Sequence, residues 1–529
     1  MRDKSLQGKF KSKLRTADEA VRMIRSGQRV FIGSSCGEPQ HLVNALLDNA
    51  NFFSDVEIVR LLSLEGSVMS LMADEHRGHK FHVRSIYQGS DQTKNLRANK
   101  RFITPLNLCA VPDLFKKKML PLHFALIQVS PPDDNGWMSL GISVHVTLAA
   151  ARSAAVVIAQ VNSMMPRTPG HSFIHLDDAS VIVEQEEELL SAFDLPAYES
   201  ASEIAAITAN LIDDGATIQL GLAELSPSIA KALAQKTDLG VHTEILTDDL
   251  MELVSRGVVT NRHKTLNEGK VIASGAIGSQ ELYRSLHNNV VIEFRPSDYV
   301  NNPAIIAQNS KMVAINFART MDLSGQVYAD ALPHNHFSGV TGMFDFILGT
   351  SMSPGGKSIM VIPARSIDGK TSRIIPKADG GAIVIPKGYV SYVVSEFGMV
   401  NLLGKNIEER AMAMIVDGRV RADLSTRKVE ITSQNHNFAI REDSLAGKPV
   451  VDLLVEVTEA VSVGDLVFSA AARGILPDPL LYGRITRVER PTGAAHWEIW
   501  MEPAVAHLVP ETVAVLRAEL SPLRVAESQ

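Results

Sequence analysis

Cysteine is scarce in this sequence, with only Cys36 and Cys109 among 529 residues. Two thiols cannot form the disulfide framework that stabilises many small secreted domains. This scarcity is typical of proteins kept in a reducing compartment, so we expect a cytoplasmic location.

Long hydrophobic runs and an excess of positive charge are also missing. The most apolar stretch, residues 146–161, is interrupted by Arg152 and Ser153 and is shorter than the roughly 20 residues of a membrane-spanning helix. The basic N-terminal segment has no apolar core of the kind found in secretory signals. The net charge is −7, which provides no general basic surface for nucleic acid or anionic lipid. We therefore expect no membrane and no nucleic-acid partner.

The sequence does contain a globular composition, with 45% hydrophobic and 21% charged residues, and its length predicts two to four domains. Thr16 and Glu19 form a capping box at the start of a predicted helix, and Gly27 is placed to end it. Continuous β-branched runs, often followed by glycine turns or helical stretches, favour parallel sheets buried on both faces and hence an α/β fold. The predicted strands of this kind cover residues 29–32, 124–129, 154–161, 217–221, 240–245, 290–294, 312–316, 358–362 and 389–395.

Changes in composition predict three domains. An acidic cluster precedes residue 190, and a new series of helices and strands begins after it. From about residue 425 the chain reads as short strands separated by turns. We expect an α/β domain at 1–190, a second α/β domain at 191–424 and a β-rich tail at 425–529.

Two short motifs have functional interpretations that the surrounding sequence does not support. Residues 33–37 match the G-x-S-x-G turn of serine hydrolases, but the roughly 30 residues before them are too few for the sheet and oxyanion loop such enzymes place upstream. A glycine-rich turn between strand and helix is favoured instead. His334 and His336 lack a Cys or carboxylate at a supporting spacing, so no metal site is expected. The phosphate-binding loop and the dinucleotide fingerprint are both absent.

Glu244 has a more informative position, at the end of a predicted strand and just before a helix. Ligands bind at the carboxyl ends of strands in open parallel sheets. A glutamate is ionised at neutral pH and can attack an activated acyl group if backbone amides stabilise the oxyanion. Glycine loops at residues 219–222 and 338–342 have amides for this role. Taken alone, a strand-end glutamate is more often a helix cap or an ion-pair partner.

The chain from about residue 16 to residue 424 resembles the acetyl-CoA hydrolase/transferase family, which includes acetate, butyrate and 4-hydroxybutyrate CoA-transferases. Nine matching stretches occur in the family's order, which is far more specific than a short motif. They are SPPDDNGWMSLGIS (130–143), VNSMMPRTPG (161–170), DDGATIQLG (213–221), GVHTEILTDD (240–249), EFRPSDYVNNP (293–303), DLSGQV (322–327), FSGVTGMFDF (337–346), SMSPGGKSIMVIP (351–363) and YVVSEFG (392–398).

The resemblance implies a role for each matching residue. Glu244, in the segment His-Thr-Glu, matches the family's catalytic glutamate, which forms an acyl-glutamyl anhydride and then a glutamyl-CoA thioester. The oxyanion amides map to Leu220 and Gly342. Asn301 and Glu396 match the active-site asparagine and a second glutamate. The residues implied in oxyanion or CoA binding are Leu220, Gly221, Leu222, Ala223, Glu224, Gly339 and Gly342.

Two departures from the family's glycine pattern bear on turnover. Ala223 and Thr341 stand where glycines are usual, and each would be strained by about 1 kcal/mol or more if its φ were positive. Glu224 adds a negative charge beside a loop expected to receive an anionic cofactor. These departures leave open a catalytically weakened scaffold or binding protein.

The tail resembles other proteins. Residues 429–445 are similar to a stretch of the carbamoyl-phosphate synthetase small subunit, without the nucleophile turn of its amidotransferase chemistry. Residues 464–485 are similar to the β-domain of a bacterial rod-shape-determining protein. Both resemblances imply a module appended to a complete transferase, with a packing or partner-binding role.

The leading hypothesis is a CoA-transferase that moves CoA between a short-chain acyl-CoA and a free carboxylate. An acyl-CoA hydrolase of the same family is the alternative, because the same glutamate serves both reactions. No permanently bound cofactor is expected, since CoA is a substrate and part of the covalent intermediate. The resemblance also implies a homodimer or a higher homo-oligomer.

Overall fold

The computed structural model divides the chain into two compact units, Met1–Val420 and Arg421–Gln529. The domain boundaries expected after residues 190 and 424 stay predictions. Among the described residues, no helix is long and apolar enough to cross a membrane. The structure describes residues 4–61, 80–86, 101–191, 198–328, 331–332, 335–336, 342–367, 369–375 and 383–416, and beyond these the backbone of the strands β25 to β30.

The first half of the Met1–Val420 unit is built on a seven-stranded sheet with the order β4-β3-β2-β1-β5-β7-β9. Every neighbouring pair is parallel. All six residues of β5 are buried, as the continuous apolar run predicts. The strands are β1 Arg29–Ile32, β2 Val56–Arg60, β3 Phe81–Ser85, β4 Arg101–Ile103, β5 Phe124–Val129, β7 Val156–Val161 and β9 Val181–Glu184.

Helices cover both faces of this sheet because alternate strand residues point to opposite sides. Val30 packs in one cluster with α2 and α3, whereas Phe31 packs in another with α4 and α5. The Phe31 and Phe115 rings meet edge to face at 5.8 Å. Thr16 and Glu19 form the predicted capping box of α2. The helices of this half are α1 Lys4–Lys13, α2 Ala17–Val21, α3 Gln40–Asp48, α4 Val111–Lys116 and α5 Thr147–Ser153.

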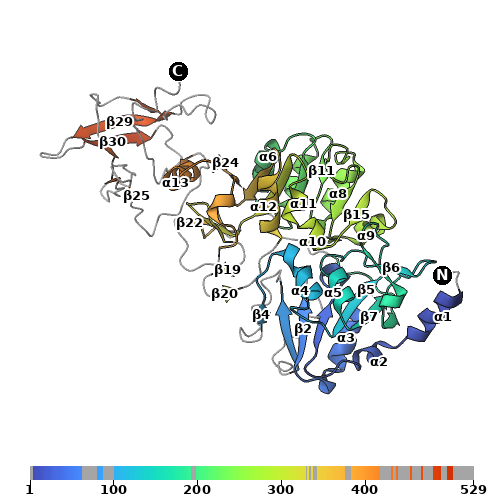
Figure 1. Ribbon diagram of the computed structural model, residues 1–529. Coiled ribbons are helices and arrows are strands. Elements are labelled where there is room, and N and C mark those ends of the chain that lie inside the picture. Colours follow the sequence, from blue (N-terminus) through green and yellow to red (C-terminus); the bar gives the residue numbers. More distant parts are fainter. Residues whose placement is uncertain are drawn as a thin grey trace. The chain divides into compact units, whose positions relative to one another are not determined.

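A six-stranded sheet forms the second half, with the order β11-β10-β16-β21-β23-β24. Figure 1 labels its two edge strands, β11 and β24. All neighbours are parallel except the edge pair β23–β24. Ile315 on β16 packs with α6 and α7, and its neighbour Ala314 packs with α12 on the other face. The strands are β10 Thr217–Leu220, β11 Gly240–Val241, β16 Met312–Phe317, β21 Lys357–Val361, β23 Tyr392–Ser395 and β24 Gly398–Asn401.

The helices of this half are α6 Ala201–Asn210, α7 Ser226–Leu233, α8 Asp248–Ser255, α9 Gln280–Leu286, α10 Ser297–Val300, α11 Pro303–Ile306, α12 Met343–Met352 and α13 Ile407–Val416.

Short strand pairs complete this unit. The predicted strand at 240–245 is interrupted: β11 ends at Val241, and a new strand begins at Ile245 and pairs with β14. Strands β13 and β15 form a parallel pair. An isolated β-bridge between His242 and Ile272 joins β13 to the segment that follows β11. The minor strands are β6 Trp137–Ser139, β8 Phe173–His175, β12 Ile245–Leu246, β13 Val271–Ala273, β14 Gly275–Ala276, β15 Ile292–Phe294, β17 Thr320–Asp322, β18 Val327–Tyr328, β19 Ala331–Leu332, β20 Asn335–His336 and β22 Ile374–Ile375.

The second unit contains a four-stranded antiparallel sheet with the order β27-β30-β29-β28 and a separate pair β25–β26. The mixed α/β class with mostly parallel sheets is confirmed, and the described elements of the tail are short strands. These strands are β25 Ile431–Thr432, β26 Asn437–Phe438, β27 Leu453–Val455, β28 Leu466–Phe468, β29 Leu481–Glu489 and β30 Trp497–Pro503.

Candidate active site

Glu244 lies at the carboxyl edge of the second sheet, in the break between β11 and β12. The amide of the preceding residue, Thr243, donates to the Ile272 carbonyl at 2.9 Å. The Glu244 carbonyl accepts from the amides of Ser274 at 2.9 Å and Gly275 at 3.2 Å. The backbone on both sides of the carboxylate is therefore fixed by β13 and β14. The sequence correctly predicted a glutamate at a strand end, although the strand itself is interrupted there.

The structure brings Asn301 and Gly342 to the Glu244 carboxyl. Asn301 follows α10, is fully buried, and donates from Nδ2 to Oε2 of Glu244 at 3.1 Å. Gly342 is the N-cap of α12. A Cβ atom on Gly342 would overlap both Oε2 of Glu244 and Nδ2 of Asn301. The α12 backbone can thus approach the carboxyl only because residue 342 has no side chain.

The environment of Glu244 makes its carboxyl a weaker acid than a free glutamate. Burial raises the pKa of Glu244 to about 7, the hydrogen bond from Asn301 opposes this, and the charge of Asp345 adds to it. Asp345 is itself fully buried in the first turn of α12, and burial raises its pKa to about 6. A carboxylate with a raised pKa is a more basic nucleophile while part of it remains ionised at neutral pH.

His242 supports this arrangement as a neutral ring. Its Nε2 lies 2.8 Å from the carbonyl of Val300, so Nε2 carries the proton, and burial lowers the pKa of His242 to about 3. The ring packs edge to face against Phe346 at 6.1 Å. His242 therefore ties the end of β11 to the residue before Asn301 and to α12. The sequence indicates His242 only as part of the His-Thr-Glu segment, and the contact with Val300 explains its position.

Leu220 ends the neighbouring strand β10. The amides of Thr217 and Gly221 donate toward β16, to the carbonyls of Lys311 at 3.2 Å and Ile315 at 2.9 Å. Because amides alternate in direction along a strand, the amide of Leu220 faces the opposite side, where β11 continues toward Glu244. The Thr243 hydroxyl lies 3.4 Å from the Leu220 carbonyl. The Leu220 amide, expected to stabilise the oxyanion, thus faces the side of β10 on which β11 lies.

The turn after Leu220 is closed by its own hydrogen bonds. Ser226 donates from Oγ to the Gly221 carbonyl at 2.6 Å and accepts from the Ala223 amide at 2.9 Å. Ala223 is not among the described residues with positive φ, so the strain considered at this position does not arise. Leu222 points outward with 48% of its surface exposed. Gly339 and Thr341 lie outside the described residues.

Glu224 does not stand alone beside this turn. Burial raises the pKa of Tyr198, Arg373 lowers it and Glu224 raises it, so all three side chains are close enough to interact. The Arg373 guanidinium lies 5.3 Å from the centre of the Tyr198 ring. Tyr198 thus has both a negative and a positive side chain near it.

Glu396 lies farther along the same sheet edge, directly after β23. Its Oε2 accepts from the Ala364 amide at 2.9 Å. The strands β10, β16, β21 and β23 are neighbours in that order. Glu396 therefore lies three strands away from β10, the strand that ends at Leu220. This hydrogen bond holds the segment after β21, so Glu396 supports the edge on which the site lies.

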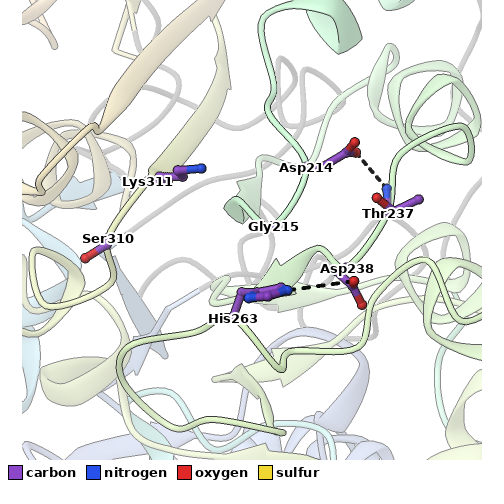
Figure 2. A pocket seen from close by; sticks show the side chains of 7 residues that line it. All are labelled: Asp214, Gly215, Thr237, Asp238, His263, Ser310 and Lys311. Carbon is purple, nitrogen blue, oxygen red and sulfur yellow. Dashed lines mark hydrogen bonds and ion pairs between the residues drawn. The ribbon is translucent and has the colours of Figure 1, made fainter.

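A surface cavity of about 340 Å³ lies at the opposite end of the strands of this sheet from Glu244. Figure 2 shows its lining, in which Asp214 accepts from the Thr237 amide at 2.8 Å and His263 faces Asp238 at 3.7 Å. Gly215 precedes β10 and Lys311 precedes β16, which places the cavity at the amino ends of the strands. It is therefore separate from the Glu244 site.

The Gly33–Gly37 turn holds Ser35 in a left-handed conformation with a φ of 61°. Its Oγ is buried and has no hydrogen-bond partner among the described residues. A serine nucleophile needs a general base within hydrogen-bonding distance. The geometry therefore agrees with a strand-to-helix turn rather than a hydrolase triad. His334 lies outside the described residues.

Asp345 and Cys109 lie near the site, and the sequence did not indicate either of them as a site residue. The backbone amide and the thiol of Cys109 both donate to the Asp345 carboxylate. The residues are 236 positions apart, so no local pattern signals the contact. Asp345 does lie inside the matched stretch at residues 337–346, which is the one available clue.

The fold and site define an α/β protein with a buried carboxylate at the carboxyl edge of a parallel sheet. The N-terminal domain model of acetyl-CoA hydrolase/transferase matches residues 1–193, and the C-terminal domain model matches residues 278–427. The chain belongs to the acetyl-CoA hydrolase/transferase family. This confirms the resemblance to that family.

Several relatives that align over most of the chain are named CoA-transferases, which confirms the expectation of an enzyme of this class. The chain is 40% identical over 408 residues to 4-hydroxybutyrate coenzyme A transferase of Clostridium kluyveri, covering 77% of this chain and 94% of the relative. It is 34% identical over 415 residues to succinyl-CoA:acetate/propanoyl-CoA:succinate CoA transferase of Fasciola hepatica, covering 78% and 86% respectively.

Solved structures also resemble the chain. RipA from Yersinia pestis matches with a TM-score of 0.74 and 33% identity, covering 78% of this chain and 95% of that one. A 4-hydroxybutyrate CoA-transferase from Porphyromonas gingivalis matches with a TM-score of 0.66 and 33% identity, covering 77% and 94%.

Proposed function

We propose that this chain transfers CoA between a short-chain acyl-CoA and a free carboxylate, with Glu244 as the nucleophile. The observation that carries the proposal is the convergence of Glu244, Asn301 and Gly342 at one point of the sheet edge. The names of the relatives, which act on 4-hydroxybutyrate, acetate, propionate, succinate and butyrate, support short-chain acids as substrates.

The first half of the reaction proceeds in two acyl-transfer steps. The Glu244 carboxylate attacks the thioester carbonyl, CoA leaves as its thiolate, and an acyl-glutamyl anhydride forms. The thiolate then attacks Cδ of Glu244, the original acid leaves as a carboxylate, and a glutamyl-CoA thioester remains. The amides of Leu220 and Gly342 stabilise the oxyanions, and the positive end of the α12 dipole adds to this stabilisation.

The second half reverses these steps with a new acid. Its carboxylate attacks the glutamyl thioester and releases the CoA thiolate, which then attacks the acyl carbon of the new mixed anhydride. The new acyl-CoA leaves and Glu244 is regenerated. Asn301 remains hydrogen-bonded to the glutamyl oxygen in both halves, and Glu396 supports the neighbouring loop.

The test is an assay with acetyl-CoA, with and without propionate or butyrate. We expect new propionyl-CoA or butyryl-CoA at the expense of acetyl-CoA, with little free thiol. Thiol release that needs no acceptor acid would instead assign the hydrolase of the same family. If neither occurs, the altered glycine loops have left a binding or scaffold protein. Size-exclusion chromatography of the same sample tests the expected homodimer or higher oligomer.

A further inference from the structure

Asp345 joins the two halves of the Met1–Val420 unit through one buried contact. Its Oδ2 accepts from the Cys109 amide at 3.0 Å, and its Oδ1 accepts from the Cys109 thiol at 3.1 Å. Cys109 lies in the short 3-10 turn Leu108–Ala110 that leads into α4, whereas Asp345 lies in α12. Both carboxylate oxygens are therefore held from the first half of the chain.

The same carboxylate is close to the proposed nucleophile. Gly342, which contacts the Glu244 carboxyl, precedes Asp345 by three residues at the start of α12. One helical turn rises only about 5.4 Å, so the Asp345 backbone is within about one turn of that contact. Asp345 has no solvent exposure, and screening of its charge is correspondingly weak. Burial raises the pKa of Glu244, and the charge of Asp345 raises it further.

The two histidines packed around this point are uncharged at neutral pH, and the nearby cations Lys264 and Arg295 act on His242. Burial lowers the pKa of His242 to about 3 and that of His145 to about 4. The His145 ring packs against Gly275, whose amide holds the Glu244 carbonyl. Burial and the charge of Asp345 raise the pKa of the Cys109 thiol to about 12, so it remains a donor. Among these described groups, Asp345 is the one whose charge reaches Glu244.

We propose that Asp345 is a positioning residue which keeps a negative charge beside Glu244 and so directs the mixed anhydride forward to the glutamyl-CoA thioester. This inference rests on the proposed function. The contact with Cys109 holds the charge in place, and it forms only when both halves of the unit are assembled. Asp345 acts through Glu244 and does not itself touch the reacting atoms.

The chemical reason lies in the two carbonyls of the anhydride. Thiolate attack on the acyl carbon breaks its bond to the glutamyl oxygen, expels the Glu244 carboxylate and returns the starting acyl-CoA. Attack on Cδ of Glu244 forms the S–Cδ bond, breaks the bond from Cδ to the bridging oxygen, and releases the substrate acid with the electron pair. The less basic carboxylate is the better leaving group. A negative charge beside Glu244 makes its carboxylate the more basic of the two, so the substrate acid leaves.

The decisive variant is Asp345→Asn, which removes the charge and keeps an oxygen acceptor for the Cys109 amide. We expect the acid limb of kcat/KM to move to lower pH by roughly half a unit to one unit. At pH 8, borohydride trapping of the glutamyl-CoA adduct should become slower by about threefold or more, because more anhydride returns to acyl-CoA. Circular dichroism and thermal unfolding establish that the variant is folded.

Two further variants separate charge from packing. Asp345→Glu keeps the charge and should keep the acid limb near its wild-type position. Cys109→Ser keeps a donor and changes no charge, and its pH profile should match the wild type. If Asp345→Asn does not fold, Asp345→Ser removes the charge with a smaller side chain and takes its place.

A folded, charge-removing variant with an unshifted acid limb and wild-type trapping rates would overturn the role of Asp345. That result would leave the proposed function intact if Glu244→Gln is inactive in the same assay. Transfer activity retained by Glu244→Gln would instead overturn the proposed function, whatever Asp345→Asn does. The two failures are therefore distinguishable.

Discussion

The side-chain amide of Asn301 donates a 3.1 Å hydrogen bond to Oε2 of Glu244, across 57 positions of sequence. Asn301 is fully buried, and its Oδ1 has no partner among the described residues. Among the described residues, the Asn301 side chain therefore forms its hydrogen bond with Glu244. It stabilises the ionised form of Glu244, because the amide donates to a carboxylate oxygen.

Replacement of Asn301 by alanine should therefore reduce the ionised fraction of Glu244 and disturb the position of its carboxylate. Loss of the donor raises the pKa of Glu244 further, so the acid limb of the pH–rate profile moves to higher pH. We expect kcat/KM to fall by about 10- to 100-fold, because a hydrogen bond to a charged group contributes about 1.5–3 kcal/mol. Steady-state kinetics over a range of pH measure both effects.

Asn302→Ala is the matched control for this variant. Asn302 accepts from the Ala304 amide at 2.9 Å and does not contact Glu244. Its loss should cost stability of about 1 kcal/mol through the cap of α11 and leave the acid limb unmoved. An Asn301→Ala profile that matches Asn302→Ala would contradict the role given to Asn301.

The wild-type pH profile follows from the raised pKa of Glu244. The nucleophile must be ionised, so activity is present above the pKa and is lost as the pH falls through about 7. We expect the logarithm of kcat/KM to decline below about pH 7 along an acid limb. A plateau that continues down to pH 5 would show that the nucleophile keeps an ordinary glutamate pKa.

Gly342→Ala tests the close approach of α12 to the site. The added Cβ would overlap Glu244 and Asn301, so the variant must displace the carboxyl, the amide or the start of the helix. We expect a loss of activity of about 100-fold or more, since small displacements at a reacting group have effects of this size. Gly388→Ala is the control, because a Cβ there meets nothing within 4 Å. Equal activity in the two variants would contradict the geometry at Gly342.

A chain truncated after Leu424 tests the role of the tail. The Met1–Val420 unit ends just before this point, and the C-terminal family match ends at residue 427. We expect the shortened protein to stay soluble and to keep its transfer activity within about threefold, a difference below about 1 kcal/mol. Soluble yield, size-exclusion elution and specific activity measure this. Insoluble or inactive protein would show that the tail belongs to the core of the enzyme.

Most of the strand pattern could be predicted because buried parallel strands leave continuous apolar runs in the sequence. Residues 124–129 are an example, since β5 covers the same six positions. The strand expected at 240–245 was wrong in part, because Thr243 bonds to Ile272 and the chain leaves β10 before reaching Glu244. Periodicity does not reveal where a strand changes its partner.

Part of the candidate site could also be predicted from the sequence, and part could not. The position of Glu244 near a strand end could be predicted from the pattern, whereas its role as nucleophile and the roles of Asn301 and Gly342 depended on the family resemblance. The contact between Asp345 and Cys109 could not be predicted, because it joins residues 236 positions apart and exists only in the folded unit. The expected strain at Ala223 depended on a backbone angle, and the sequence does not record that angle.

The central claim is that Glu244 becomes covalently attached to CoA during the reaction. The most direct measurement is to mix the enzyme with acyl-CoA, reduce with borohydride, and analyse the peptide around residues 242–244 by mass spectrometry. A glutamyl thioester is reduced to an alcohol, whereas an ionic contact is not. We predict modification at Glu244 that requires acyl-CoA, with no modification and no transfer activity in Glu244→Gln. An unmodified peptide from active enzyme, or substantial transfer by the folded variant, would contradict the account.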